Sequence, residues 1–347
     1  LNDKIDGFGY GSDPRIENIK KGRNAKKDFA CIYELDEKNI ATSIADFKNG
    51  DIVVYYGDFE YTSGINLKNL KIIIGNAYFN SLTMVSGLEN LQTISGDAWF
   101  RRLKTAKGLD NLQSIGGNAV FLSLNTAEGL ENLRSIGWSA HFVRLETAEG
   151  LNSLQSIGHD ADFKNLKTAE GLENLRSIGW SAHFVRLETA EGLNSLQSIG
   201  HDADFKNLKT AEGLENLRSI GWNAYFDSLE TAKGLESLRD IGFIAHFDSL
   251  ETAEGLNNLQ TIGRDTYFES LKTARDLNNL QTIGGYANFA NLKTAEGLNN
   301  LQTIGEGALF NSLETAEGLE KCNKYNKIKL AIATGKMSEV PKYIEIN

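Results

Sequence analysis

Two histidines and two aspartates alternate along the chain at one fixed interval, as His141, Asp162, His183 and Asp204. Imidazoles and carboxylates bind divalent metals, and they also pair with each other as ions. If each residue lies on one turn of a coil, neighbours are about 5 Å apart along a straight line. Ligands in a line do not converge on one ion, so we predict an ion ladder, no metal site and no cofactor. Because carboxylates beside histidine favour the imidazolium, ligand binding on this face is expected to change between about pH 5 and 8.

Aromatic and acidic side chains recur beside this ladder at the same interval. All five histidines and all four tryptophans of the chain fall in two positions of the repeat, and aspartate recurs in a third. Such side chains on an exposed sheet face are typical of a recognition surface. The residues predicted to contact a partner are Trp138, His141, Asp160, Asp162, Trp180, His183, Asp202, Asp204, Trp222 and Tyr225.

The tryptophans have two open interpretations. They either contact the ligand or form an aromatic stack that serves the fold. Their position also accepts Gly75, Arg264 and Glu306, a range that a core position would not tolerate, so the chain is expected to turn there. Residues 126–167 are identical to residues 168–209, and the identity continues through Trp222. Part of the pattern is thus a copied unit, which can lengthen a protein without selecting any side chain.

Two further rows of charged residues are expected on another flank. One alternates in sign, which stabilises adjacent strands, and consists of Glu146, Lys167, Glu188, Lys209 and Glu230. The other repeats one sign and is tolerable only in solvent, with calcium binding as the alternative; it consists of Glu128, Glu149, Glu170, Glu191 and Glu212.

Phenylalanines indicate the elements that position all these side chains. Twelve of them, from Phe79 to Phe310, recur at equal spacing in the unit L-x-x-L-x-x-I-G-x-x-A-x-F-x-x-L-x-x-A-x-G. A period of about 20 to 30 residues repeated this often predicts a solenoid whose coils share one core. Only the step from Ala161 to Phe163 has the two-residue spacing of a strand, and the other steps suit tight turns or 3₁₀ segments. We predict a mainly β, leucine-rich-repeat-like right-handed coil with one short parallel strand per repeat.

Two recurrent glycines have different expected roles. Gly171 and its equivalents fit a turn with positive φ, where only Asp276 departs from glycine. Gly158 is replaced by Ile74 and Ser95 in the first two coils. Those coils therefore bend differently, or this glycine permits close packing.

A family resemblance rests on the stretch Asn279-Leu280-Gln281-Thr282-Ile283-Gly284, followed by Ala287 and Phe289. This stretch resembles bacterial leucine-rich-repeat surface proteins, and its repeats are similar to BspA-like repeats and to those of receptor L domains. The resemblance covers residues 67–319. It departs from the usual pattern because Leu166 stands where an asparagine ladder is normally found. The resemblance implies a module for binding or adhesion, and it identifies no ligand.

Three regions are expected along the chain. They are an N-terminal segment and cap at residues 1–66, a solenoid of about twelve repeats at residues 67–319, and a C-terminal cap at residues 320–347. Degenerate strands at residues 51–61 and a short helix before Gly335 would cover the exposed core and sheet edge.

Composition argues against several classes of function. The formal net charge of −10 disfavours nucleic acid as a partner, and there is no run of about 18 apolar residues to span a membrane. Cys31 and Cys322 lie in opposite end segments, so no disulfide is expected within one chain. The chain has no phosphate-binding glycine loop, no His-Glu-x-x-His and no serine elbow, so we predict that it is not an enzyme.

The sequence thus predicts a non-enzymatic interaction module that binds a protein or glycan through its exposed strand face, in adhesion or host interaction. A structural spacer whose repeat number sets its length is the alternative. A cell-surface or secreted location is expected, and the start at Leu1 without methionine fits either a removed signal peptide or a shortened chain. The ligand, the source, the compartment and the oligomeric state are left open.

Overall fold

The computed structural model describes residues 32–35, 52–61 and 67–335. The chain divides into two compact units, Leu1–Val143 and Arg144–Asn347. Most of the expected N-terminal cap, together with Cys31, lies outside the described residues.

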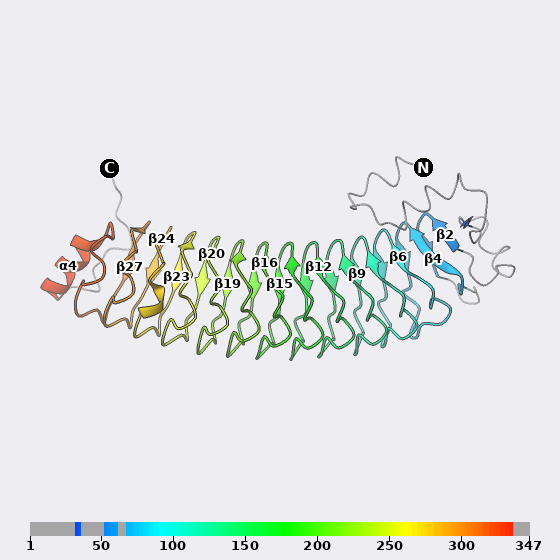
Figure 1. Cartoon of the computed structure of the whole chain (residues 1–347), viewed down its shortest axis with the longest axis horizontal. Coiled ribbons are helices and arrows are strands. Elements are labelled where there is room, and N and C mark those ends of the chain that lie inside the picture. The colour runs from blue at the N-terminus through cyan, green and yellow to red at the C-terminus, as the bar shows by residue number, and fades with distance from the viewer. Residues whose placement is uncertain (1–31, 36–51, 62–66, 336–347) are drawn as a thin grey trace. The chain divides into compact units, whose positions relative to one another are not determined.

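The first unit is a coil of parallel strands (Figure 1). The strands of its first sheet are, in spatial order, β1 (Ile32–Leu35), β2 (Ile52–Tyr56), β4 (Leu70–Ile74), β6 (Thr93–Ile94), β8 (Ser114–Ile115) and β10 (Ser135–Ile136). The strands of its second sheet are β3 (Phe59–Glu60), β5 (Ala77–Tyr78), β7 (Ala98–Trp99), β9 (Ala119–Val120) and β11 (Ala140–His141).

The second unit repeats this plan over eight coils. One sheet consists of β12 (Ser156–Ile157), β14 (Ser177–Ile178), β16 (Ser198–Ile199), β18 (Ser219–Ile220), β20 (Asp240–Ile241), β22 (Thr261–Ile262), β24 (Thr282–Ile283) and β26 (Thr303–Ile304). The other consists of β13 (Ala161–Asp162), β15 (Ala182–His183), β17 (Ala203–Asp204), β19 (Ala224–Tyr225), β21 (Ala245–His246), β23 (Thr266–Tyr267), β25 (Ala287–Asn288) and β27 (Ala308–Leu309). A 3₁₀ turn, η2 (Arg275–Leu277), and a helix, α4 (Tyr325–Thr334), complete the unit.

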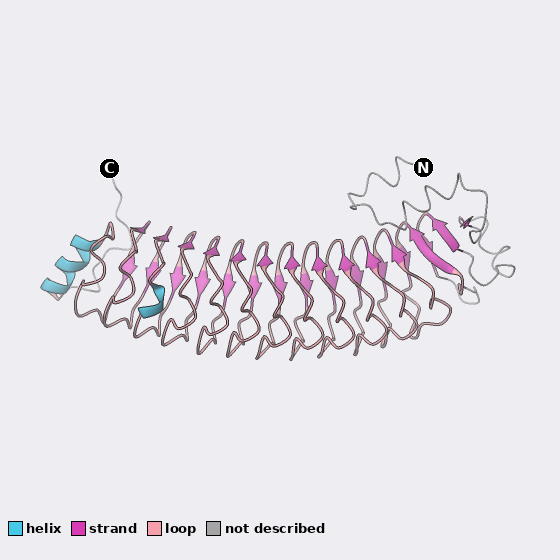
Figure 2. Cartoon of the chain, in the orientation of Figure 1, coloured by secondary structure: helices cyan, strands magenta, loops and turns pink. Residues whose placement is uncertain are grey.

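The predicted class, a parallel β-solenoid of leucine-rich-repeat type with one repeat per turn, is confirmed. The prediction of one strand per repeat is wrong in number, because each repeat carries two strands (Figure 2). The additional strand, such as β12, consists of a serine or threonine followed by isoleucine. A strand of two residues buries one apolar side chain, so it leaves no alternation in the sequence by which to recognise it.

Stacked phenylalanines fill the core of each unit. Their side chains are fully buried, and neighbouring ring centroids lie 4.8 to 5.2 Å apart in the first unit. They lie 5.2 to 5.5 Å apart in the second. The column continues before the regular repeat, because Phe59 and Tyr61 place their rings 5.5 and 6.2 Å from that of Phe79. Strands β2 and β3 lie within residues 51–61, where the sequence predicts degenerate strands.

The two recurrent glycines serve the two expected purposes. Gly171 has φ of 100°, the positive value that the sequence predicts. An added Cβ on Gly171 would also clash with the carbonyl oxygen of Ala148, and one on Gly200, whose φ is not positive, would meet the carbonyl oxygen of Gly179 at 2.1 Å. Close packing is therefore the right alternative for the second glycine position. At the exception, Asp276, the positive-φ turn is replaced by η2.

An asparagine ladder does exist, at a position other than the one in the usual leucine-rich pattern. Asn174 Nδ2 donates to the carbonyl of Asn152 at 2.6 Å, and Asn216 repeats this contact with Asn194. Each asparagine thereby satisfies a backbone carbonyl of the preceding coil, which an exposed turn would leave to water.

Helix α4 lies in the segment where the sequence predicts a helix. It ends at Gly335, whose backbone has φ of 67° and whose N–H donates to the carbonyls of Ala331 and Ile332. The role of this segment as a cap remains a prediction. No helix in the described part of the chain has the length and apolar character needed to cross a membrane.

A candidate partner-binding surface

The residue after the close-packed glycine lies at a corner between the two sheets. In one coil, residues 179–181 connect β14 to β15, and the side chain of Trp180 is 44% exposed. The chain therefore turns where the sequence predicts it to turn. We call the corner residues of five successive coils the aromatic strip; it consists of His159, Trp180, His201, Trp222 and Phe243.

The rings of the aromatic strip form one continuous stack. Trp180 lies 5.3 Å from His159 and 4.4 Å from His201, measured between ring centroids, with the planes within 10° of parallel. Trp222 lies 5.4 Å from His201 and 4.1 Å from Phe243. The guanidinium of Arg264 covers Phe243 at 5.2 Å. One ring per coil can stack in this way because the distance between adjacent parallel strands is close to the distance between the centroids of stacked aromatic rings.

Trp180 and Trp222 thus form the aromatic stack that one interpretation predicts, and contact with a ligand stays an untested prediction. Trp222 is 39% exposed despite its two ring neighbours. Trp138 holds the same corner position in the first unit and is 47% exposed.

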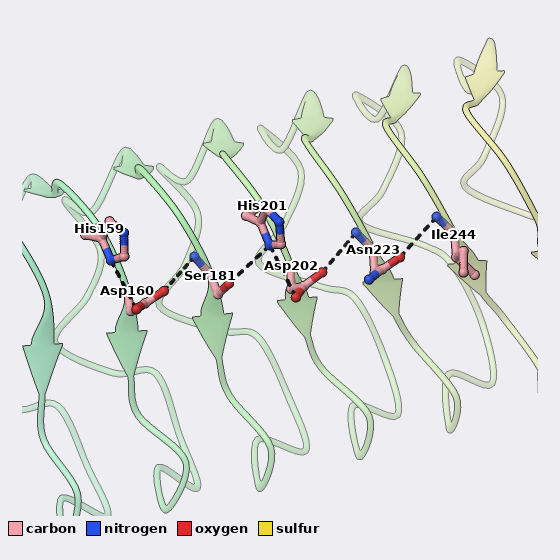
Figure 3. A network of polar contacts seen from close by, with 7 residues as sticks. All are labelled: His159, Asp160, Ser181, His201, Asp202, Asn223 and Ile244. Carbon is pink, nitrogen blue, oxygen red and sulfur yellow. Dashed lines mark hydrogen bonds and ion pairs between the residues drawn. The ribbon is translucent and has the colours of Figure 1, made fainter.

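A polar ladder lies beside the strip (Figure 3). Asp160 Oδ1 accepts the backbone N–H of Ser181 at 3.1 Å, and Asp202 Oδ1 accepts that of Asn223 at 3.2 Å. The other oxygen of each carboxylate lies beside the preceding imidazole, with Oδ2 to Nδ1 distances of 3.1 Å for His159 and 3.3 Å for His201. Asp160 and Asp202 therefore orient the histidines of the strip and join successive coils. This role is missing from the sequence-based prediction, which treats both residues only as partner contacts.

The predicted ion ladder is only partly present. His183 lies in register with Asp162 on one side and Asp204 on the other. Within the described residues, however, these carboxylates form ion pairs with lysines: Lys164 lies 3.3 Å from Asp162 and Lys206 lies 4.0 Å from Asp204. The lysine is two residues further along the same chain, so it reaches the same side of the coil. His141 lies half-buried in β11 of the first unit.

A second, shorter stack extends the surface. Tyr225 lies 5.2 Å from His246, which lies 4.6 Å from Tyr267. Lys206 Nζ lies 4.7 Å from the centre of the Tyr225 ring. Burial raises the pKa of the Tyr225 hydroxyl above its ordinary value, and nearby carboxylates, Asp202 first, add to the rise. The sequence-based site omits His246 and Tyr267, although both follow Tyr225 in the same column of the repeat.

The charged rows on the other flank have the expected arrangement. Lys167 Nζ lies 2.7 Å from Glu146 and Lys209 Nζ lies 3.7 Å from Glu230, so the row of alternating sign forms cross-coil pairs. The row of glutamates is exposed, as its repulsion requires. Calcium binding by that row stays an untested prediction.

Residues 198–316 match the family described as BspA type leucine rich repeat region, in six copies. This part of the chain is thus similar to BspA-type leucine-rich repeats. The resemblance stated from the sequence is thereby confirmed. These leucine-rich repeats include three members of the aromatic strip and the whole of the second stack. A solenoid of this type is typically a scaffold for interaction without catalysis.

Two solved structures match the chain at low sequence identity and a low TM-score. A chain of the TLR13–ssRNA13 complex is 14% identical, with a TM-score of 0.22, over 78% of this chain and 56% of that chain. A chain of the mouse RP105/MD-1 complex is 14% identical, with a TM-score of 0.24, over 87% of this chain and 66% of that chain. The protein thus spans less than two thirds of either structure, and such low scores carry no argument about its partner. No curated protein sequence matches the chain.

Proposed function

We propose that the chain is a non-enzymatic interaction module that binds a protein partner through the aromatic strip and the strand residues beside it. In the second unit the contact residues are those predicted from the sequence, extended by His246 and Tyr267, and Trp138 and His141 are the contacts proposed for the first unit by itself. The observation that supports this most is the exposure of Trp180 and Trp222 in a continuous stack. Tryptophan is enriched among the residues that dominate binding energy at protein interfaces.

The orientation of the rings favours a protein over a glycan. Sugars typically pack on the faces of aromatic rings. Both faces of Trp180 are covered, by His159 and His201, and both faces of Trp222 by His201 and Phe243. The strip therefore presents ring edges, which carry partial positive charge. Ring edges suit the carbonyl groups and apolar side chains of a protein.

The polar ladder supports the same proposal. Asp160 and Asp202 tie the corner backbone of one coil to the next and hold the histidine rings in place. A surface fixed in this way loses little side-chain entropy when it binds, so more of the contact energy is available for affinity. Adhesion or host interaction, which the resemblance implies, is the biological setting of this proposal.

The alternative is a structural spacer whose repeat number sets a length. The identity of residues 126–167 with residues 168–209 favours it, because a copied unit extends the solenoid regardless of its surface. The two functions differ in what they require, since a spacer needs the coils and not the exposed rings.

The test compares two double variants of the full chain as bait for its partner. We expect Trp180→Ala/Trp222→Ala to lose capture of a protein that the wild type retains. Glu170→Ala/Glu212→Ala changes exposed residues on the other flank and should retain it. Capture of the same protein by both variants would contradict the proposal. If the wild type binds to a glycan array and the tryptophan variant does not, the partner is a sugar and not a protein.

A further inference from the structure

Three metal-binding side chains converge beside the second stack. Asp227, His246 and Asp248 each offer one ligand atom, and these atoms all lie within 4.8 Å of one another. His246 and Asp248 flank the buried Phe247, so they project on the same side of one coil. Asp227 holds the position of Asp248 in the preceding coil. This arrangement brings ligands from two columns together, unlike the straight line of His183 and its neighbours.

No lysine follows the phenylalanine in the coils of Asp227 and Asp248, unlike two earlier coils. In the coils of Asp162 and Asp204, the residue after phenylalanine is a lysine that pairs with the aspartate. In the next two coils that residue is Asp227 and then Asp248. The basic side chain beside them in the described structure is that of His246, whose Nδ1 lies 3.4 Å from Asp248 Oδ2. Ligand atoms of two carboxylates one coil apart thus lie within 4.8 Å of a single imidazole nitrogen.

Two of the carboxylate oxygens are shielded from solvent without a hydrogen bond. They are Asp227 Oδ2 and Asp248 Oδ2, and the second of them faces Nδ1 of His246 at 3.4 Å without the geometry of a hydrogen bond. A buried acceptor that lacks a donor costs about 1 to 3 kcal/mol, and more when it carries charge. A cation at this point would satisfy both oxygens, so the burial provides evidence for a ligand that is separate from the residue types.

The surrounding structure holds the three groups in place. Ser249 donates to the carbonyl of Asp227 through its N–H at 3.2 Å and through Oγ at 2.6 Å. The imidazole of His246 is held between the rings of Tyr225 and Tyr267. Ligands on a rigid frame keep most of their binding energy for the ion.

We propose that Asp227, His246 and Asp248 bind one divalent transition-metal ion of the Zn²⁺ type. One imidazole nitrogen and two carboxylate oxygens are common ligands for such ions. Bond lengths of about 2.1 Å place tetrahedral ligands about 3.4 Å apart, which is the distance between His246 Nδ1 and Asp248 Oδ2. Calcium fits less well, because it takes six to eight oxygen ligands. Three protein ligands leave one position open for water or for a side chain of a partner.

The test measures Zn²⁺ binding to the full chain by titration calorimetry after removal of metal with a chelator. The wild type should bind Zn²⁺ at this site, and both Asp227→Asn and His246→Gln should weaken that binding by more than about tenfold. The double variant Asp162→Asn/His183→Gln is the matched control, because it removes the same types of group from two other coils, where Asp162 already pairs with Lys164. It should bind Zn²⁺ as the wild type does.

Thermal unfolding separates loss of the site from loss of the fold. Zn²⁺ should raise the Tm of the wild type and of the control, because it binds the folded state. Zn²⁺ should leave the Tm of Asp227→Asn unchanged. Without Zn²⁺, this variant should melt at a temperature no lower than that of the wild type, because one of two repelling charges is gone. Equal binding by the wild type and Asp227→Asn would overturn the proposal, as would a wild type that shows neither heat of binding nor a shift in Tm.

Discussion

The indole of Trp180 and the imidazole of His201 lie face to face, 4.4 Å apart between centroids and 10° from parallel. They belong to successive coils, so the contact joins two turns of the solenoid on its outside, as the phenylalanine column does on its inside. The same ring pair supports the fold and presents an edge to solvent.

Loss of one indole should therefore cost stability as well as binding. Trp180→Ala removes two stacked pairs, each worth about 0.5 to 1.5 kcal/mol, so the free energy of unfolding in urea should fall by about 1 to 3 kcal/mol. Met84→Ala is the control, because Met84 is 71% exposed. An equal and negligible effect of both substitutions would show that the stack does not stabilise the coil.

The glycines allow a test of close packing against backbone conformation. Gly192 has φ of +100°, and an added Cβ would lie 2.2 Å from the carbonyl oxygen of Ala169. Gly335 has φ of +67° and nothing within 4 Å of an added Cβ. Alanine at either place costs about 1 to 2 kcal/mol for a left-handed conformation, and only Gly192→Ala adds a clash with backbone. Gly192→Ala should lower Tm much more than Gly335→Ala, and equal losses would contradict the packing seen at this turn.

The regular part of the fold is predictable from the sequence for a simple physical reason. Each coil must bury the same residues against its neighbours, so Phe163 and its equivalents are repeated without variation and reveal the period. The second strand of each coil is not predictable in the same way, because a pair such as Ser156–Ile157 is too short to show a strand pattern. Tyr61 replaces phenylalanine before the regular repeat begins, which hides the earlier coil from a search for the period.

The candidate surface is predictable in outline and not in its contacts. The constant repeat interval places Trp180 and Trp222 in one column, and the structure stacks them through His201. The interval does not reveal that Asp160 binds the backbone of the next coil, because an aspartate in a hydrogen bond and an exposed aspartate look alike in sequence. Asp227 and His246 lie in different columns of the repeat, so their proximity requires the coil geometry.

The copied unit predicts a deletion that preserves the fold. Removal of residues 168–209 joins Lys167 to Thr210, and the sequence that follows is the same as the one removed as far as Trp222. Every residue at the junction keeps neighbours of the same type, so circular dichroism per residue should be unchanged and Tm should fall by only a few degrees. Removal of residues 168–177 alone breaks the register of the repeat and should unfold the surrounding coils. Equal damage from both deletions would contradict the view that coils are interchangeable units.

Alkaline pH should weaken the second stack. Burial raises the pKa of Tyr225 and of Tyr267 above the ordinary value of 10.0. The folded state therefore favours the neutral phenols, and the stability they contribute is present below about pH 10 and is lost as pH rises through the higher pKa of the folded state. Urea midpoints should fall as pH rises from about 9 to about 11, and the fall should be smaller in Tyr225→Phe/Tyr267→Phe. A midpoint that falls equally in the double variant would assign the effect to other groups.

The central claim is that the aromatic strip is the surface covered by a partner. Oxidative footprinting reads this directly, by comparing the labelling of Trp180 and Trp222 in the free chain and in the complex with its captured protein partner. The account predicts that both tryptophans are labelled several-fold less in the complex, while the exposed Met84 is labelled equally in the two states. Unchanged labelling of Trp180 and Trp222 in a fully bound sample would contradict it.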